Sequence, residues 1–431
     1  MTTAMSDPVS DHVDTRFALL PYIDELRSAE SLSQRLGFAV RPRRIRVKPG
    51  RSAMVAWQRE EPGHLGGFAD WGFTAVMTGS DKLANARRRA ARHGQDLLVH
   101  EAADPRSAGA TGAVLVSGGV LADPRIGKHI SRTLDHLGGN LTIIGYNPAR
   151  RLLLKHTPVY GAPEFLRITA DSQNHLAEAA DRWQRAQLPS LPVDFVGGRD
   201  TATRSPWWGT GDLSDHPDPN VAEEVGVIIA ELHRGTGVDC VSAPRTGTET
   251  GARIVDAAAD PVSAVVDQAE TIVRSVVRLL PEREAEIVGL LAQLRVRLGT
   301  CKGQDRREIH GDLSPDQVLL RNAECRIIDL DRSGYGPAGM DVGRWIAACR
   351  VEGGQSELTG LNGLEQPFLD GFRSAGGEEV DLGAWTAWAM LTAALEPWRS
   401  CSENWRVETM RIIDLAGSAL EENAPTTEVA P

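Results

Sequence analysis

Residues 309–320 read Ile-His-Gly-Asp-Leu-Ser-Pro-Asp-Gln-Val-Leu-Leu, and residues 326–331 read Arg-Ile-Ile-Asp-Leu-Asp. This pattern predicts a strand, a polar turn, an apolar strand, a second turn and a further apolar strand. It places Asp312 in the first turn and Asp329 at the end of the last strand. A hairpin-like return of the chain between them would turn both carboxylates toward one cleft.

A pair of carboxylates in one cleft suits phosphoryl transfer from a nucleotide. One carboxylate accepts or orients the proton of the attacking hydroxyl, and the other holds a magnesium ion against the phosphates. Because hard cations prefer oxygen ligands, the amide oxygen of Gln317 is a candidate to complete the protein's part of the metal shell. Asp331 either joins Asp329 as a metal ligand or caps the next turn, and the sequence favours neither.

The chain resembles a known family at residues 310–312 (His-Gly-Asp), 318–320 (Val-Leu-Leu), 327–331 (Ile-Ile-Asp-Leu-Asp) and 341–343 (Asp-Val-Gly). These motifs are similar to those of aminoglycoside phosphotransferases and of their choline-kinase and maltokinase-like relatives. The resemblance implies an α+β, protein-kinase-like bilobal fold. It also implies transfer of a phosphoryl group from ATP or GTP, with Mg²⁺, to a hydroxyl of a small molecule.

The resemblance also implies roles for individual residues. Asp312 matches the catalytic base, Asp329 matches the magnesium ligand, and His310 matches the residue that supports the catalytic loop. Gln317 departs from the family, because most members carry asparagine as the second metal ligand; glutamine at this position resembles the maltokinase-like branch. Its side chain is one methylene longer, so the metal or the loop must shift by roughly 1 Å.

In the family, a lysine on the third strand of the nucleotide lobe contacts the phosphates and pairs with an acid on the next helix. The corresponding strand here, residues 165–169, carries Arg167, and Lys155 on the preceding strand is the other candidate. Arginine keeps the positive charge, although it does not simply replace lysine at such a site. The acidic partner is Glu178 or Asp181. The sequence contains no P-loop or Rossmann glycine motif.

A length of 431 residues suits two or three packed lobes. We predict an N-terminal cap over residues 1–137, a nucleotide-binding N-lobe and linker over 138–219, a mostly helical catalytic C-lobe over 220–423, and a disordered tail over 424–431. The cap again resembles the maltokinase-like branch. Residues 188–219, rich in proline, glycine and aspartate, are predicted to be a loop or linker between lobes.

A weak internal similarity links the predicted cap and the predicted N-lobe. Residues 47–51 read Val-Lys-Pro-Gly-Arg and residues 146–150 read Tyr-Asn-Pro-Ala-Arg, in each case between two predicted strands. The similarity reflects either a duplication or chance. In both cases the second copy is the better nucleotide lobe, because it directly precedes the catalytic lobe.

Composition limits the function classes. A formal net charge of −11 disfavours nonspecific binding to nucleic acid, and 41% hydrophobic residues are enough to form a core. No apolar run reaches the ~20 residues of a membrane helix, and residues 1–14 show no signal-peptide pattern. The five cysteines are scattered and form no Cys-x-x-Cys pair. We therefore expect a cytoplasmic protein without a membrane partner.

The C-terminal part is acidic and rich in tryptophan. Residues 351–422 carry 13 acidic side chains and four arginines, a net charge of −9. The tryptophans either face a hydroxylated or cationic ligand or form a core beneath a solvated acidic face. A proline interrupts a predicted helix near the expected substrate cleft, so three adjacent residues are our first candidates for substrate contact: Glu396, Trp398 and Arg399.

The function predicted from these features is a kinase of an amino sugar, an aminoglycoside-like antibiotic or a saccharide. The alternatives are a nucleotide-binding pseudokinase without turnover and a maltokinase-like kinase of a neutral sugar. The presence of both Asp312 and Asp329 favours an enzyme. The acidic C-terminal part slightly favours a cationic acceptor, because opposite charges attract over roughly 8–10 Å at ordinary salt.

Overall fold

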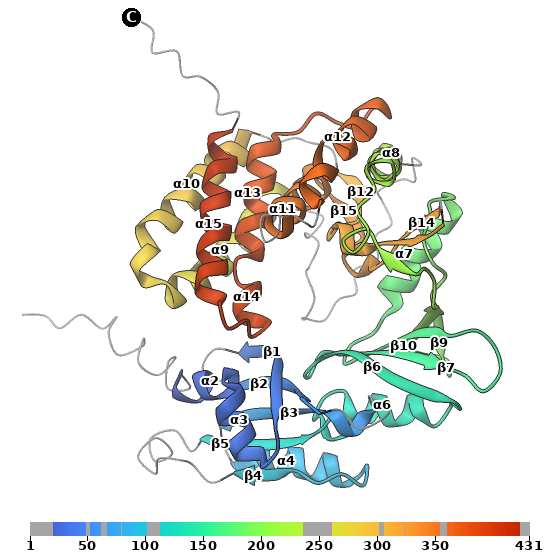
Figure 1. The fold of residues 1–431 in the computed structure, drawn as a ribbon, viewed down its shortest axis with the longest axis vertical. Coiled ribbons are helices and arrows are strands. Elements are labelled where there is room, and N and C mark those ends of the chain that lie inside the picture. The colour runs from blue at the N-terminus through green and yellow to red at the C-terminus, as the bar shows by residue number, and fades with distance from the viewer. Residues whose placement is uncertain are drawn as a thin grey trace, which may run out of the picture. The chain divides into compact units, whose positions relative to one another are not determined.

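The computed structural model describes residues 20–48, 52–61, 67–78, 80–100, 113–235, 261–300, 306–322, 324–353 and 360–422 (Figure 1). These residues form two units. The first contains the described parts of Met1–Gln173, Asp194–Trp207 and Trp398–Glu403, and the second those of Asn174–Val193, Trp208–Pro397 and Asn404–Pro431. The three-domain division drawn from the sequence stays a prediction.

The first unit opens with two helices and an antiparallel sheet in the order β1-β2-β3-β5-β4. The two helices are separate because the Ser28 side chain accepts a hydrogen bond from the Ser31 amide (3.2 Å) and caps the second one. The elements are α2 (Leu20–Arg27), α3 (Ala29–Leu36), β1 (Val40–Lys48), β2 (Ser52–Arg59), β3 (Trp71–Thr78), α4 (Ser80–Ala91), β4 (Leu98–His100) and β5 (Ala113–Gly119).

A second antiparallel sheet follows, in the order β6-β7-β8-β10-β9. Counted along the chain, this is the strand order of the first sheet. In both sheets a helix follows the third strand, α4 in the first and α7 in the second. The elements are α6 (Gly127–Leu134), β6 (Asn140–Asn147), β7 (Arg151–Thr157), β8 (Glu164–Thr169), α7 (Asn174–Arg185), β9 (Asp194–Val196) and β10 (Arg199–Pro206).

The prediction that residues 188–219 form a loop or linker is wrong for a large part of that range. β10 pairs with β8 from Ala202↔Ile168 to Pro206↔Glu164, so it completes the second sheet. Its sequence, Arg-Asp-Thr-Ala-Thr-Arg-Ser-Pro, has almost no apolar alternation. Backbone hydrogen bonds to the neighbouring strands hold it, and sequence patterns do not report those.

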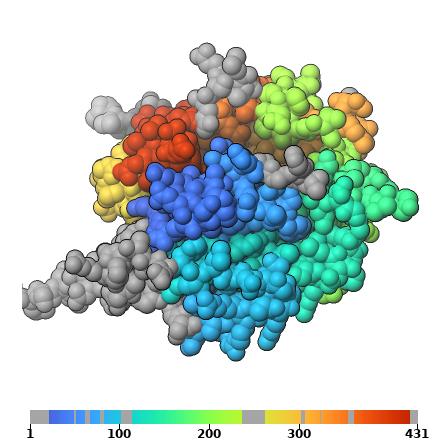
Figure 2. Space-filling model, turned by 60° about the horizontal axis from the view of Figure 1, so that its bottom comes forward, coloured from blue at the N-terminus to red at the C-terminus, as the bar shows by residue number. Residues whose placement is uncertain are grey.

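One hydrophobic cluster draws on both sheets of the first unit. Phe73 and Val116 of the first sheet and Leu154 and Ile168 of the second all belong to it, and each is fully buried. In Figure 2 the blue segment of the first sheet adjoins the teal segment of the second. The two sheets therefore share a core.

A buried polar junction also joins the two sheets. Asp123, between β5 and α6, accepts hydrogen bonds at Oδ2 from the Tyr146 hydroxyl (2.7 Å) and the Ala149 amide (2.7 Å). Arg46 on β1 donates to the Ala149 carbonyl (2.9 Å). Burial and the neighbouring Asp123 raise the pKa of Tyr146, so it remains a hydrogen-bond donor. The junction fixes the turn between β6 and β7.

The second unit is largely helical (Figure 1). α9, α10, α13 and α15 pack against one another, and α8 packs against α12. Its helices besides α7 are α8 (Pro219–Arg234), α9 (Pro261–Leu279), α10 (Glu284–Thr300), α11 (Gly339–Gly353), α12 (Glu365–Ser374), α13 (Leu382–Ala393) and α15 (Trp405–Glu421). The chain passes between the units within the short helix α14 (Glu396–Arg399).

Short strands of the second unit form two small sheets. One has the order β11-β13-β14 and the other pairs β12 with β15. The strands are β11 (Gly211–Asp212), β12 (Arg307–Ile309), β13 (Val318–Arg321), β14 (Glu324–Ile327) and β15 (Gly334–Gly336). β12, β13 and β14 match the strands that the sequence pattern predicted around residues 309–331, whereas β11 and β15 lie outside that stretch.

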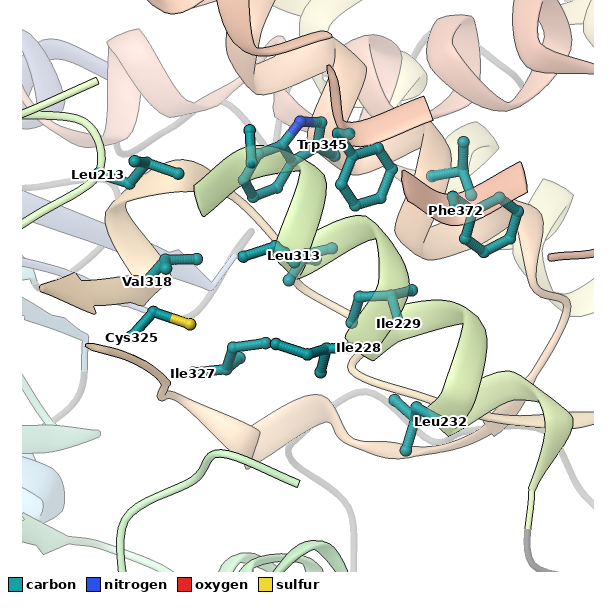
Figure 3. Close-up of a cluster of buried hydrophobic side chains, with 14 of the residues drawn as sticks. Leu213, Ile228, Ile229, Leu232, Leu313, Val318, Cys325, Ile327, Trp345 and Phe372 are labelled. Atoms are coloured by element: carbon teal, nitrogen blue, oxygen red, sulfur yellow. The ribbon is translucent and has the colours of Figure 1, made fainter. Parts of the chain in front are cut away.

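The core of the second unit settles one alternative left open by the sequence. Trp345, Trp385 and Trp388 are fully buried, so these three tryptophans form core and do not face a ligand. Figure 3 shows Trp345 and Leu313 in a cluster with aliphatic side chains of α8. Leu313 follows Asp312 directly, so this cluster anchors the loop that carries Asp312.

Among the described residues, no helix is long and apolar enough to cross a membrane. Cys325, Cys349 and Cys401 are free and buried, as expected of small hydrophobic side chains. Cys240 and Cys301 lie outside the described residues.

Candidate active site

The site is built on the turn between β12 and β13, called here the catalytic loop (residues 310–317). After β12 ends at Ile309, the loop passes through Asp312 and the 3-10 turn Pro315–Gln317 and enters β13. β14 then returns antiparallel to β13 with Val318 opposite Ile327, which brings Asp329 back beside the loop's end. The predicted alternation of strands and turns is confirmed.

Asp341, on α11, holds the backbone at the start of the catalytic loop. Its carboxylate accepts hydrogen bonds from the amides of His310 (2.8 Å) and Gly311 (2.7 Å) and bonds to His233 Nε2 (2.9 Å). Burial of Asp341 opposes ionisation, but hydrogen bonds from His233 and the Gly311 amide, with the nearby histidines, lower its pKa below the usual value. Asp341 is therefore an anion that fixes the loop.

Gly311 is required by the shape of this loop. Its φ is 81°, and a Cβ atom there would lie 2.3 Å from the backbone oxygen of Arg332. Only glycine adopts this conformation and leaves that space. The close approach brings residues 311 and 332 together, next to Asp312.

His310 connects the catalytic loop to the strand that leads to Asp329. Its buried ring accepts a hydrogen bond from the Asp312 amide at Nδ1 (3.3 Å), so Nε2 carries the proton and donates to the Ile328 carbonyl (2.8 Å). The edge of the ring meets Trp183 with 5.8 Å between ring centroids. These contacts agree with a supporting role for His310, which stays a prediction.

Two arginines contact Asp312, and the sequence analysis missed both. Arg332 Nη1 lies 2.8 Å and Arg344 Nη1 lies 3.0 Å from the same carboxylate oxygen, Oδ1. The Asp312 side chain is 31% exposed, so it remains accessible. A signal for Arg344 was present in the sequence: it follows Asp341 by three residues, and this spacing puts both on one face of a helix.

The candidate metal ligands lie next to the ends of two adjacent strands, Gln317 before β13 and Asp329 after β14. The Ile328 amide donates to the Gln317 carbonyl (2.9 Å), which places Gln317 beside the residue that precedes Asp329. Asp329 has a left-handed backbone (φ 59°), a conformation that aspartate tolerates better than most residues. Gln317 donates its amide nitrogen to Asp316 (3.1 Å), so its amide oxygen is the atom suited to a cation. Asp331 is half-buried in the following 3-10 turn.

Among the described residues, no three histidine, cysteine, aspartate or glutamate side chains are arranged to hold a metal ion by themselves. A cation near Asp329 would therefore need other ligands in addition to carboxylates of the protein.

The two candidate cations of the second sheet have different surroundings. Arg167 is 4% exposed and lies on β8 between Leu153 of β7 and Thr203 of β10. The Lys155 ammonium lies 4.3 Å from the ring centroid of Trp207, a cation–π contact. Glu178 and Asp181 are exposed on α7, and the structure does not select between them.

The three candidate substrate residues fall into different units. Glu396 belongs to the second unit and acts electrostatically on Arg344. Trp398 and Arg399 belong to the first unit, where Trp398 is 8% exposed and its carbonyl accepts a hydrogen bond from Arg27 (3.3 Å). The Arg27 guanidinium lies 5.3 Å from the Trp398 ring centroid. Of the three, Glu396 is the one that acts on a partner of Asp312, namely Arg344.

α7 contacts the strands of the catalytic site through residues that the sequence analysis also missed. The Trp183 indole donates to the Ser333 hydroxyl (3.2 Å), and Arg182 pairs with Glu308 of β12 (2.9 Å). The buried tryptophan in an otherwise charged helix was the available signal. α7 therefore supports the catalytic loop through contacts with His310 and β12, whereas α11 binds the amides of the loop.

Antiparallel strands, a helical unit and a loop that presents one aspartate, with a second aspartate after the next hairpin, are the parts of a protein-kinase-like fold. A model of the phosphotransferase enzyme family matches residues 149–390, more than half of the chain, and the chain belongs to this family. The match starts in the β6–β7 turn, so the first sheet precedes the family's region. The predicted α+β, protein-kinase-like fold with an N-terminal cap and a largely helical C-terminal part is confirmed.

Solved structures of low sequence identity align with most of the chain. Spectinomycin phosphotransferase APH(9)-Ia, bound to ADP and spectinomycin, is 12% identical, with 68% of this chain and 97% of that chain covered and a TM-score of 0.46. A thermostable mutant of aminoglycoside phosphotransferase APH(4)-Ia, bound to ADP and hygromycin B, is 14% identical (69% and 99% covered, TM-score 0.49).

A choline/ethanolamine kinase family protein from Mesorhizobium loti is 17% identical, with 66% of this chain and 89% of that chain covered and a TM-score of 0.42. A search of curated protein sequences found no match.

Proposed function

We propose that the protein is a magnesium-dependent kinase that transfers the γ-phosphate of ATP or GTP to a hydroxyl of a small molecule. The observation that carries the proposal is the geometry of the catalytic loop. Asp341 holds the loop amides, His310 links the loop to Ile328, and the accessible Asp312 carboxylate stands at its turn. Phosphoryl transfer depends mostly on positioning and electrostatic stabilisation, and this loop supplies both.

Asp312 is the proposed base. Its Oδ1 atom accepts from Arg332 and Arg344, which leaves Oδ2 to accept or orient the proton of the acceptor hydroxyl. The two guanidinium groups hold one oxygen of this carboxylate through charge-assisted hydrogen bonds. Proton transfer to a positioned side chain contributes typically about 10²–10⁴-fold to the rate.

The donor set around Asp329 fits a magnesium ion. Asp329 would supply a carboxylate oxygen and Gln317 an amide oxygen, and a backbone hydrogen bond between Ile328 and Gln317 holds the two residues near each other. Mg²⁺ is usually bound by one or two carboxylates together with substrate phosphates and water, so a protein site without three acidic ligands is suitable. When bound, the ion would neutralise charge on the phosphates. Asp331 is the further candidate on the same turn.

Arg167 is the preferred phosphate contact in the nucleotide-binding sheet, and Lys155 is the second choice. Arg167 is held in the middle of the sheet by strands on both sides, whereas the Lys155 ammonium lies over Trp207. A buried, preorganised guanidinium suits a phosphate because it donates two parallel hydrogen bonds. Glu178 remains the proposed acidic partner, with Asp181 as the alternative.

The proposed acceptor is an amino sugar or an aminoglycoside-like antibiotic, ahead of a neutral saccharide. The net charge of −9 over residues 351–422 supports a cationic acceptor. Glu396 is its first proposed contact, because it acts electrostatically on Arg344, which contacts Asp312. Trp398 and Arg399, on the same short helix, are the further candidates. We place the reaction in the cytoplasm, where nucleoside triphosphates are supplied.

A substrate screen tests the proposal. The purified protein would be incubated with Mg²⁺, ATP or GTP, and choline, neutral sugars, amino sugars or aminoglycosides, and phosphorylated products would be identified by mass spectrometry. We expect phosphorylation of an amine-bearing acceptor, with kcat/KM falling as salt rises. Phosphorylation of neutral sugars alone would indicate a maltokinase-like kinase. Nucleotide binding without any product would indicate a pseudokinase.

A further inference from the structure

Arg344 is a largely buried cation with few partners. Its side chain is 14% exposed, its Nη1 atom lies 3.0 Å from Asp312 Oδ1, and its guanidinium lies 4.9 Å from the ring centroid of Trp388. Within the part of the chain that the structure describes, its Nε atom has no hydrogen-bond partner. Burial lowers the pKa of Arg344, and the Asp312 charge opposes that change. The carboxylate of Asp312 is thus the main compensation for burying this charge.

α11 holds three consecutive residues of the catalytic loop. Asp341 binds the amides of His310 and Gly311, and Arg344, one helical turn later, binds the side chain of Asp312. One rigid helix therefore fixes both the path of the loop and the direction of the carboxylate.

Packing of α11 against α13 fixes the position of Arg344. A Cβ atom on Gly343 would lie 2.4 Å from the Trp385 carbonyl, so α11 approaches α13 more closely than any other residue would permit. Trp388, on the same helix α13, faces the Arg344 guanidinium and donates its indole hydrogen to the Val265 carbonyl (3.0 Å). The support for Arg344 thus comes from buried, rigid helices.

We infer that Arg344 is a positioning residue for the proposed base: it fixes Asp312 Oδ1 so that Oδ2 is presented to the acceptor hydroxyl. This inference rests on the proposed function. Arg332 binds the same oxygen, but its side chain is 35% exposed and has more freedom, whereas Arg344 is held by α11 and Trp388. When Arg344 is lost, Asp312 Oδ1 keeps only the more exposed Arg332 as a partner, so the carboxylate is free to reorient.

The test compares Arg344→Met and Arg344→Lys with the wild-type enzyme, using whichever acceptor the substrate screen identifies. We expect kcat to fall by about 10²-fold in Arg344→Met, the scale of a misplacement of about 1 Å, and by about tenfold in Arg344→Lys, which keeps the charge. The KM for the nucleotide should change less than twofold, because the nucleotide does not depend on the direction of Asp312.

Arg326→Met is a matched control. The Arg326 guanidinium also lies over a tryptophan, 5.1 Å from the Trp208 ring centroid, but no contact joins it to Asp312. It should keep the wild-type kcat. An unchanged kcat in folded Arg344→Met would overturn the inference.

A second measurement does not depend on turnover. Crystal structures of Arg344→Lys and Arg344→Met should show the Asp312 carboxylate turned away from its wild-type direction, more so in the methionine variant. An Asp312 carboxylate that keeps its position in both variants would overturn the inference even if no acceptor is found. A wild-type protein that phosphorylates nothing would contradict the proposed function instead.

Discussion

The first unit contains two sheets with one strand order and different chemistry. In each sheet a hairpin begins the fold, a third strand follows, and a helix leads to the remaining two strands. The registers allow residue-by-residue matching, because Lys48 pairs with Ser52 across the first hairpin and Asn147 pairs with Arg151 across the second. The weak similarity noted in the sequence of the two hairpins thus extends to the order of all five strands.

Matched positions show where the sheets differ. Two residues into the second strand, Met54 pairs with Ala75 in the first sheet, and Leu153 pairs with Arg167 in the second. Ala75 is fully buried where the second sheet has its buried arginine. Two residues further along the second strand, the first sheet has a buried alanine and the second sheet has Lys155.

The first sheet has a buried polar side chain, Thr74, one residue before Ala75. Thr74 bonds to the Trp57 indole (3.2 Å) and the Ser117 hydroxyl (2.8 Å), whereas the matched residue of the second sheet is the fully buried Leu166. The shared topology therefore does not carry the proposed nucleotide chemistry. In our proposal a cation of the second sheet, Arg167 or Lys155, carries it, and the first sheet has a buried alanine at each matched position.

Replacing Arg167 by the residue of the first sheet should have the largest effect. Arg167→Ala removes charge-assisted hydrogen bonds of about 1.5–3 kcal/mol, so the affinity for a non-hydrolysable ATP analogue should fall about 10- to 100-fold. Isothermal titration calorimetry measures this directly. Arg204→Ala, on the adjacent strand and exposed, is the control and should bind normally. If Arg167→Ala also binds normally while Lys155→Ala does not, Lys155 is the phosphate contact.

Disrupting the junction between the sheets should have the next largest effect. Asp123→Asn replaces an acceptor of the Tyr146 hydroxyl and the Ala149 amide, so we expect a loss of about 1–3 kcal/mol in the free energy of unfolding. Denaturant titration followed by tryptophan fluorescence measures it.

Asp171→Asn is the control for this junction. It breaks the exposed Arg125–Asp171 pair (2.9 Å) and should cost under about 1 kcal/mol. Equal losses in the two variants would show that the junction does not hold the sheets together.

The polar group of the first sheet should give the smallest effect. Thr74→Val keeps the shape of the side chain but leaves the Trp57 indole and the Ser117 hydroxyl with one partner fewer, a loss of about 1–2 kcal/mol in stability. Nucleotide affinity should not change. A fall in nucleotide affinity comparable to that of Arg167→Ala would mean that the first sheet also takes part in binding.

The sequence predicted the catalytic loop and the strands around it because their pattern is local. Residues 309–331 alternate between apolar runs and turn residues, and the motif residues sit at fixed places in that alternation. The first hairpin was also predicted, because Pro49-Gly50 separates two runs of strand-forming residues in the sequence. Strand β10 was missed because backbone pairing with β8, a partner distant in sequence, stabilises it.

The site residues that the sequence analysis missed are those whose contacts join segments distant in sequence. Arg332 and Arg344 meet at Asp312 through a loop and a helix, and charged residues at these places read as solvated surface when only the sequence is known. The burial of Trp345, Trp385 and Trp388 was equally undecided, because helical spacing fits both a core and a binding face. Tertiary packing selected the core.

The most direct test of the account is the turnover of Asp312→Asn. Asparagine keeps the size of the side chain and its contacts with the loop but cannot accept the proton of the acceptor hydroxyl. We predict that kcat falls by about 10²-fold or more, the usual scale for a positioned acid–base group, while nucleotide affinity stays near the wild-type value. A kcat close to wild type in this variant would contradict the central claim that Asp312 is the base.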